Sequence, residues 1–247
     1  MITLYQFEIS PFCDKVRRIL NVKHVPYRIE EVPPSKTIST VRKLNPAGKL
    51  PFITDDGETV ADSTDIAHYL DERYPEPRLI PDDPHARALC HILEDWADES
   101  LYFYEMRLRF TLPHNARRFI PELVKYERAL VQRIAPLAMP VVLRRTVASQ
   151  GIGKKPIAVV LRDVERHLDA VRDLLGNERW LLGDRLSLAD ISVFAQLFCI
   201  RASDEGAAMV KARPAVAEWL ERVERATAPR TDDDHNPARE AARGSGR

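Results

Sequence analysis

The sequence has few cysteines and no excess of charge. Its three cysteines, Cys13, Cys90 and Cys199, are too few and odd in number for a disulfide framework, so we expect a reducing compartment, the cytoplasm. Lys plus Arg and Asp plus Glu both number 37 among the 247 residues. A balanced chain has no net field that would attract it to nucleic acid or to an anionic membrane, and we expect neither as a partner.

Long apolar runs are also missing. The longest dense one, residues 134–143, includes Pro136 and Pro140, whereas about 20 residues are needed to cross a bilayer. We interpret this run as a buried, kinked helix and the basic pairs 144–145 and 154–155 as solvated surface. The first residues contain no basic segment followed by a long apolar one, so we expect no signal peptide.

Motifs for metal and phosphate chemistry do not occur. There is no His-Glu-x-x-His or Cys-x-x-Cys ligand set, and His85 and His91 are not spaced to share a metal ion on one helix. Residues 151–154 lack the upstream glycine and the following Ser or Thr of a phosphate-binding loop. We therefore expect no metal cofactor, and a surface turn at 151–154.

Short strand and helix signals alternate in the first 75 residues. Asp55-Asp56-Gly57 separates two of the strand-like runs and predicts a tight hairpin turn. The expected strands are residues 2–7, 27–32, 50–54 and 58–61, and the expected helices begin near residues 11 and 63. This order predicts an α/β domain over residues 1–75, with a parallel first pair of strands and an antiparallel hairpin at one side.

A proline-rich stretch at residues 76–84 separates this domain from a region of different character, and we expect an extended linker there. Beyond it the strand signals nearly vanish and apolar residues recur at helical spacing, so residues 85–226 are predicted to form an all-helical domain. Within it, Ser187 and Asp190 have the spacing of a capping box at a helix start. Residues 227–247 have no core pattern and are predicted to be a disordered tail.

The segment Ser10-Pro11-Phe12-Cys13 lies where the first strand becomes the first helix. Unpaired backbone N–H groups and the positive end of the helix dipole favour an anion at such a position. A hydroxyl and a thiol three residues apart therefore suggest thiolate chemistry. From the residues alone, the anionic sulfur could belong to Cys13 or to a bound thiol that Ser10 assists.

Four motifs in this order resemble those of the cytosolic glutathione transferases over roughly residues 1–226. They are Ser10-Pro11-Phe12-Cys13, Asn45-Pro46-Ala47-Gly48-Lys49-Leu50-Pro51, Asp62-Ser63 and the segment 183–190. The resemblance implies a thioredoxin-like N-terminal domain followed by an all-α C-terminal domain. It also implies that glutathione is the co-substrate and that the protein forms a homodimer.

The resemblance assigns the glutathione-binding residues. Pro51 matches a cis proline that turns the backbone of Leu50 towards the peptide, although a strand-edge proline would look the same. Asp62 and Ser63 match residues that hold the γ-glutamyl carboxylate at a helix N-terminus, although they also suit a plain N-cap. Asp62 is shorter than the Gln or Glu of many members. The remaining candidates for binding glutathione are Phe12, Lys36 and Lys49.

The resemblance also bears on the reactive sulfur. Ser10 matches the serine with which some members stabilise the glutathione thiolate, and this favours conjugation to a small apolar electrophile. Cys13 has the spacing of a buried packing residue, but it could also serve a thiol-disulfide or peroxide reductase. The N-terminal half also resembles the glutaredoxin-like half of type 2 prostaglandin E synthases, and metaxin-like proteins supply a non-catalytic alternative.

The second substrate is expected to meet the helical domain. In the family the first long helix of this domain faces the thiol site, so Trp96, Tyr102, Phe103 and Arg107 are the candidates for binding it. The segment 108–155 is longer than a compact helical hairpin requires, and we expect it to enlarge or cover the pocket.

Overall fold

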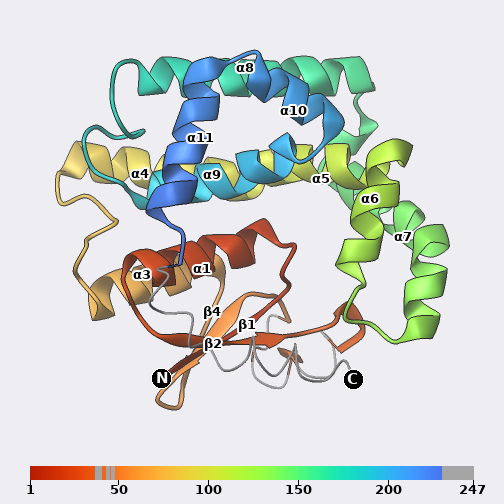
Figure 1. Cartoon of the computed structure of the whole chain (residues 1–247), viewed down its shortest axis with the longest axis horizontal. Helices are drawn as coiled ribbons and strands as arrows, with labels where there is room; N and C mark the ends of the chain where they lie inside the picture. The colour runs from red at the N-terminus through yellow and green to blue at the C-terminus, as the bar shows by residue number, and fades with distance from the viewer. Residues whose placement is uncertain (37–40, 43–44, 46–47, 230–247) are drawn as a thin grey trace. The chain divides into compact units, whose positions relative to one another are not determined.

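The computed structural model describes residues 1–36, 41–42, 45 and 48–229. It separates into two compact units, and Figure 1 colours residues 1–78 of the first red to orange and the second yellow to blue. Unit 1 comprises Met1–Arg78 with Arg225–Arg247, and unit 2 comprises Leu79–Glu224. Each unit is described by itself.

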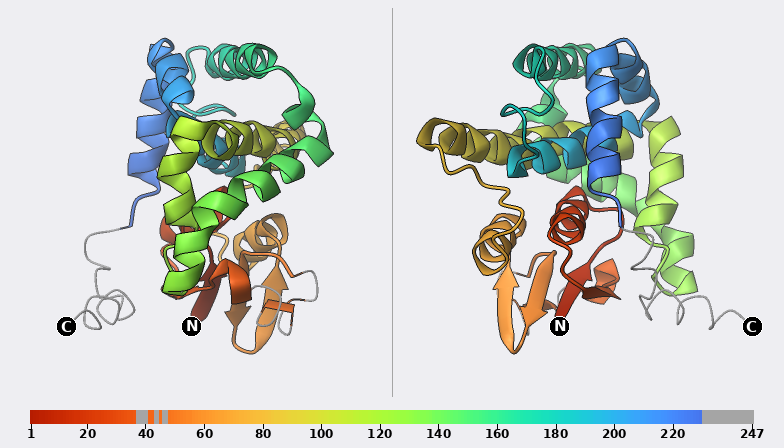
Figure 2. Two further views of the ribbon diagram at one scale, coloured as in Figure 1. Left: turned by 90° about the vertical axis from the view of Figure 1, so that its right-hand side faces the viewer. Right: turned by 60° about the vertical axis from the view of Figure 1, so that its left-hand side comes forward.

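Unit 1 is a four-stranded mixed sheet with two helices on one face (Figure 2). Its elements are β1 (Ile2–Gln6), α1 (Pro11–Val22), β2 (Tyr27–Glu31), η1 (Pro34–Lys36), β3 (Phe52–Asp55), β4 (Glu58–Ala61) and α3 (Ser63–Arg73). The strand order is β2-β1-β3-β4, in which β1 and β2 are parallel and the other pairs are antiparallel. The predicted parallel pair and lateral hairpin are thus confirmed.

Local sequence explains these elements. Asp56 and Gly57 turn β3 into β4 with φ angles of 46° and 92°, a left-handed pair that Asp and Gly tolerate best. On α1, Val16, Ile19 and Leu20 are fully buried, as their helical spacing predicts. Helix α1 therefore presents one apolar face to the sheet and to α3.

A buried ion pair fixes the far end of α1 to α3. The Lys23 ammonium is fully enclosed and donates to the Asp71 carboxylate at 2.8 Å. It also donates to the carbonyl oxygens of Tyr74 at 2.6 Å and Pro77 at 3.0 Å. All three hydrogens of the ammonium have acceptors, so this charge is satisfied within unit 1.

Unit 2 consists of helices. They are α4 (Pro84–Trp96), the π-helical turn η3 (Ala97–Leu101), α5 (Tyr102–Thr111), α6 (Pro113–Leu123), α7 (Ala129–Gln150), η4 (Ile152–Lys154), α8 (Ile157–Leu175), α9 (Leu188–Arg201), α10 (Asp204–Lys211) and α11 (Pro214–Ala226), of which the last two residues belong to unit 1. Helix α9 is the centre of the core, because twelve of its fourteen residues are buried. The predicted capping box is present at its start, between Ser187 and Asp190.

Helix α7 corrects one prediction. The run 134–143 is helical and continues through Pro136 and Pro140, but Ile134 is 50% and Leu137 80% exposed, so the prediction of a buried helix is wrong. The buried residues of α7 are Ala135 and Val147. Larger apolar side chains of the same helix are exposed to solvent. No helix among the described residues combines the length and apolar character needed to cross a membrane.

The chain beyond α11 returns to unit 1. Thr227 is buried, and its hydroxyl accepts from Arg18 at 2.6 Å while its carbonyl accepts from Asn21 at 3.1 Å. The predicted tail therefore begins with a residue that is bonded to α1. Residues 230–247 of that tail lie outside the described part of the chain.

Candidate functional site

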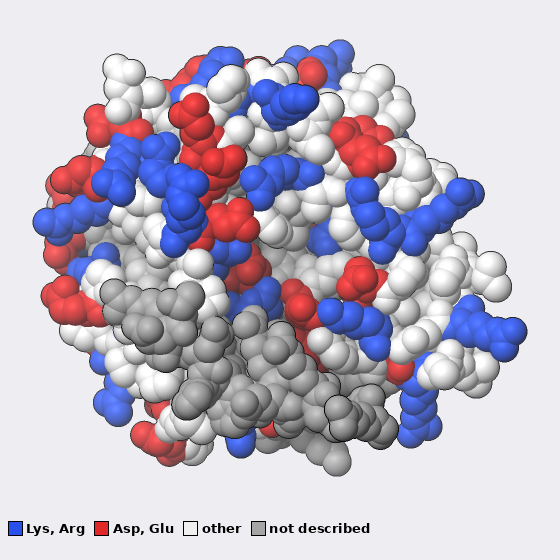
Figure 3. Space-filling view, in the orientation of Figure 1, with Lys and Arg blue, Asp and Glu red and all other residues white. Residues whose placement is uncertain are grey.

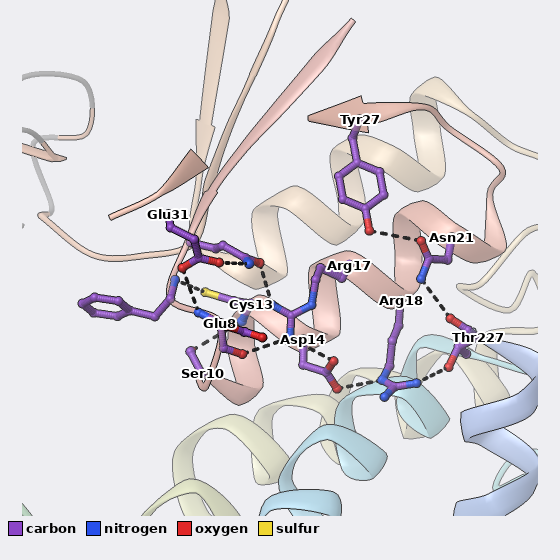
Figure 4. Close-up of polar contacts among 12 residues, drawn as sticks. Glu8, Ser10, Cys13, Asp14, Arg17, Arg18, Asn21, Tyr27, Glu31 and Thr227 are labelled. Carbon is purple, nitrogen blue, oxygen red and sulfur yellow. Dashed lines mark hydrogen bonds and ion pairs between the residues drawn. The ribbon is translucent and has the colours of Figure 1, made fainter. Parts of the chain in front are cut away.

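Ser10 is the N-cap of α1, and its side chain is partly exposed. Its hydroxyl oxygen accepts the N–H of Cys13 at 3.5 Å, a long and therefore weak bond. A hydroxyl that accepts from the helix still has its own proton to donate. Ser10 can thus cap α1 and donate a hydrogen bond to an anionic sulfur placed at the helix N-terminus (Figure 4).

Cys13 lies one turn into α1 and is fully buried. Its sulfur accepts the backbone N–H of Phe7 at 3.4 Å. Burial raises the pKa of the Cys13 thiol to about 11, and the contacts with Phe7, Arg17 and Ser10 only partly oppose this. The thiol is therefore protonated at neutral pH and inaccessible, which favours packing over reductase chemistry.

Alkylation should reveal this inertness. With a pKa of about 11, roughly one Cys13 thiol in 10,000 is ionised at neutral pH. We expect iodoacetamide to modify Cys13 in the native protein at least about 100-fold more slowly than in urea, measured by peptide mass spectrometry. Rapid native labelling, or a mixed disulfide with oxidised glutathione that disappears in Cys13→Ala, would instead support a redox role.

A polar network beneath the turn holds the loop between β1 and α1. Arg17 of α1 donates to the Gln6 side chain at 2.6 Å, to the Glu8 carbonyl at 3.1 Å and to Asp14 at 3.1 Å. Glu31 of β2 accepts from the Gln6 amide and from the Glu8 backbone N–H. These bonds join β1, β2 and α1, and they fix the loop that carries Ser10 (Figure 4).

The opposite flank of α1 is tied to the returning chain. Asp14 accepts from Arg18 at 2.7 Å, and Arg18 in turn binds Thr227. Asn21 binds the Thr227 carbonyl and accepts from the Tyr27 hydroxyl at 3.1 Å (Figure 4). Helix α1 is thus held from both sides by bonds that the sequence did not predict.

The Leu50–Pro51 peptide bond is cis, as the family resemblance implies. Pro51 is buried at the start of β3, whereas Leu50 is only partly buried. Among the other candidates, Phe12 is partly buried, and Lys36 and Lys49 are exposed. Pro46 and Ala47 of the predicted motif lie outside the described residues.

The start of α3 has one feature that the sequence analysis missed. Asp62 is the N-cap and accepts from the Thr64 N–H at 2.9 Å, and Ser63 is the first helical residue. Ser63 is buried, and its hydroxyl accepts from the ammonium of Lys15, a residue that is 1% exposed, at 3.4 Å. Lys15 lies four residues before buried Ile19 on α1, and this spacing was the available signal for a lysine on the buried face.

The candidates for the second substrate lie on α4 and α5 of unit 2. Trp96 and Phe103 are partly buried and pack against the unit 2 core, and the Trp96 ring meets His167 edge to face at 5.4 Å. The Tyr102 and Phe103 rings are 5.0 Å apart. Arg107 donates to Thr111 at 2.8 Å, and burial, followed by the charge of Arg144, lowers its pKa. The segment 108–155, which was expected to enlarge or cover the pocket, contains the end of α5 followed by α6, α7 and η4.

The next question is whether the described residues could hold a metal ion. Among the residues that the structure describes, no group of three His, Cys, Asp or Glu side chains could hold a metal ion. The polar groups around Ser10 are instead a hydroxyl, a capped helix start and a separate cation–hydroxyl pair at α3. Helix N-termini with hydroxyl groups and a neighbouring cation are suited to an anion.

Comparisons with known proteins identify the family. The glutathione S-transferase N-terminal domain family matches residues 4–78, and the glutathione S-transferase C-terminal domain family matches residues 154–222. An isoprene-epoxide glutathione S-transferase of Rhodococcus sp. (strain AD45) is 25% identical over 236 residues, which are 90% of this chain and 98% of that protein. A stringent starvation protein A homolog of Pasteurella multocida is 36% identical over 101 residues, 39% of this chain and 48% of that protein.

A solved structure agrees over nearly the whole chain. The glutathione S-transferase of Rhodospirillum rubrum F11 has a TM-score of 0.66 and 26% identity, and the match covers 91% of this chain and 88% of that one. The N-terminal domain match falls on the mixed sheet of unit 1, and the C-terminal domain match falls on the helices of unit 2. The chain belongs to the cytosolic glutathione transferase superfamily.

Proposed function

We propose that this protein is a glutathione transferase in which Ser10 activates the glutathione thiol for attack on a small apolar electrophile. The observation that carries the proposal is the contrast at the start of α1. The Ser10 hydroxyl is partly exposed and has a proton to donate, whereas the Cys13 thiol is buried and protonated. The reactive sulfur is therefore supplied by the bound peptide.

Unit 1 supplies the proposed glutathione site. The Leu50 backbone beside Pro51 pairs with the cysteinyl part of the peptide, and Phe12 contacts it near the thiol. The Ser63 hydroxyl and the N-terminus of α3, with Asp62 beside them, hold the γ-glutamyl end. Lys49 and Lys36 are exposed cations for the glycine carboxylate.

The chemical step requires little of the protein beyond the thiol. The thiol proton leaves to solvent, and the Ser10 hydrogen bond with the α1 N-terminus stabilises the thiolate. The sulfur lone pair forms a C–S bond as the carbon–leaving group bond breaks. In an epoxide that bond is C–O, and the opened oxygen takes a proton from solvent. Lowering a thiol pKa from about 8.5 to about 7 requires only about 2 kcal/mol.

The relatives support a small electrophile as the second substrate. The Rhodococcus relative is an isoprene-epoxide glutathione S-transferase, and the match spans 98% of that protein. Isoprene epoxide is small, apolar and electrophilic. Trp96, Tyr102 and Phe103 are the proposed apolar contacts, and Arg107 is the proposed contact for an oxygen of the electrophile. The cytoplasm and a homodimeric state, both implied by the resemblance, belong to the same proposal.

A single substitution at Lys15 tests the proposed glutathione site. A lysine ammonium can only donate, so the Ser63 oxygen accepts from it and the Ser63 proton points elsewhere. We expect Lys15→Met to weaken glutathione binding about tenfold by calorimetry, because the γ-glutamyl carboxylate loses an oriented donor and a nearby buried charge. Lys15→Arg keeps the charge and should lose less.

A matched ligand isolates this effect. The analogue 4-aminobutanoyl-cysteinyl-glycine lacks the γ-glutamyl α-carboxylate, so wild type and Lys15→Met should bind it equally. Equal losses for both peptides would mean that Lys15 acts only on the fold. If the wild-type protein binds no glutathione at all, the transferase proposal fails and a non-catalytic binding role replaces it.

A further inference from the structure

Helix α7 carries its larger apolar side chains on the outside. Only Ala135 and Val147 of this helix are buried. The exposed side chains are Leu130 (69%), Val131 (36%), Ile134 (50%), Leu137 (80%), Val141 (51%) and Val142 (53%). Single exposed apolar residues are common on protein surfaces, but six on one helix indicate an interaction surface.

These six residues, here called the α7 patch, share one face. At about 100° per residue they fall within a sector of roughly 140° that begins at Leu137 and ends at Val142. Arg133 and Arg144 lie along one border of this sector. Arg128 is the N-cap at the N-terminal end of the helix, and Arg145 lies inside the sector at the C-terminal end. The patch is thus apolar in the middle and has cations along one border and at both ends.

The sequence on either side of the patch contains no carboxylate residue. Between Glu127 and Asp163 there is no Asp or Glu in a chain that contains 37 of them. The ion pairs of unit 2 include neither the N-cap Arg128 nor the three arginines of α7, and among these four only Arg144 has a described acceptor, the Thr111 carbonyl at 3.3 Å. In Figure 3, blue and white side chains dominate the surface over α7. The total charge of zero conceals this local excess.

We propose that α7 binds the surface of an anionic lipid bilayer, lying in the plane of the interface with the patch inserted and the arginines at the phosphates. An exposed apolar face bordered by cations is the pattern of an interfacial helix. Long arginine side chains can reach phosphates while their stems remain in the apolar layer. We expected no membrane partner because the total charge of the chain is zero. The cations gathered around α7 create a local positive charge, and this local charge leads us to propose a membrane partner.

The charges also argue against other occupants. In a symmetric pairing of two copies through α7, Arg128 and Arg133 would face the other copy's Arg144 and Arg145, or their own equivalents, so like charges would meet. An acidic helix of a partner protein would need carboxylates in register with the cations at both ends of the patch and along its border. A continuous anionic surface satisfies these cations without a fixed register.

Co-flotation of the full-length protein with vesicles tests the proposal. One set of vesicles is phosphatidylcholine, and the other contains one third phosphatidylglycerol. We expect at least about tenfold more binding to the anionic set, with loss of binding at high salt. Leu137→Gln should remove binding by weakening insertion, and Arg144→Gln with Arg145→Gln should remove it by weakening attraction. Circular dichroism checks that each variant is folded.

Two matched changes outside the patch serve as controls. Leu174→Gln replaces a 39% exposed leucine on α8, and Arg172→Gln replaces a 47% exposed arginine that is paired with Asp169. Both should bind anionic vesicles like the wild type. The proposal is overturned if the wild type does not float with anionic vesicles, or if control and patch variants lose binding equally. It is also overturned if light scattering shows a dimer that Leu137→Gln dissociates while vesicles remain unbound.

Discussion

Replacing Ser10 by alanine is expected to lower kcat/KM for glutathione conjugation about a hundredfold at neutral pH. The variant lacks the hydroxyl that donates to the thiolate, and loss of one preorganised donor to a developing or stabilised anion typically has an effect of this size. The pKa of the bound thiol should rise towards its ordinary value of about 8.5. The loss should therefore be largest below neutral pH and should shrink as the pH rises above that value.

The effect on helix capping must be separated from the effect on the thiol. Ser10 caps α1, and alanine at an N-cap costs about 1 kcal/mol, whereas glycine costs only a few tenths. Ser10→Gly should therefore be more stable than Ser10→Ala yet equally inactive, and Ser10→Thr should retain much of the activity. The bound-thiol pKa is measured from thiolate absorbance in the ultraviolet. Unchanged pH profiles in both hydroxyl-free variants would exclude Ser10 as the activating group.

Burial of the side chain at residue 13 is the reason why we propose this role for Ser10. In the first turn of α1, the side chain of residue 10 is partly exposed and that of residue 13 is enclosed. Desolvation by burial is the largest cause that raises the pKa of the Cys13 thiol, the charge of Glu31 adds to it, and the contacts with Phe7, Arg17 and Ser10 compensate only in part. We therefore propose that the reactive thiol at this helix belongs to a ligand that enters from solvent. The Arg17 network supports this arrangement by fixing the loop before Ser10.

Parts of this fold could be predicted because they depend on neighbours in the chain. The hairpin at Asp55-Asp56-Gly57, the start of α3 at Ser63 and the capping box at Ser187 each depend on residues within a few positions of one another. The family resemblance added the cis bond before Pro51. Alternation and helical spacing then sufficed for the order of elements in unit 1.

Other parts could not be predicted because they join residues far apart. Lys15 and Ser63 are 48 positions apart, and Arg18 and Thr227 are 209 apart, so only the folded chain brings them together. Helix α7 shows a different limit. Its apolar residues surround the helix, and periodicity alone cannot tell which of them face a neighbour and which face solvent.

The second large effect is expected at Asp190, the buried carboxylate at the start of α9. Its Oδ1 accepts from the Leu181 N–H at 2.9 Å and from the Trp219 indole N–H at 3.0 Å. Its Oδ2 accepts from the Ser187 N–H at 3.0 Å and from the Ser187 hydroxyl at 2.7 Å. One side chain thus satisfies four donors and joins α9 to the preceding loop and to α11.

Asp190→Ala should therefore destabilise unit 2 by about 3–5 kcal/mol, because several buried donors lose their acceptor at once. All three tryptophans, Trp96, Trp180 and Trp219, lie in unit 2, so their fluorescence during urea unfolding reports on this unit. Asp184→Ala, an exposed change in the same loop, should stay within about 0.5 kcal/mol of wild type. Similar urea midpoints for the two variants would show that the Asp190 network contributes little to holding α9 and α11 together.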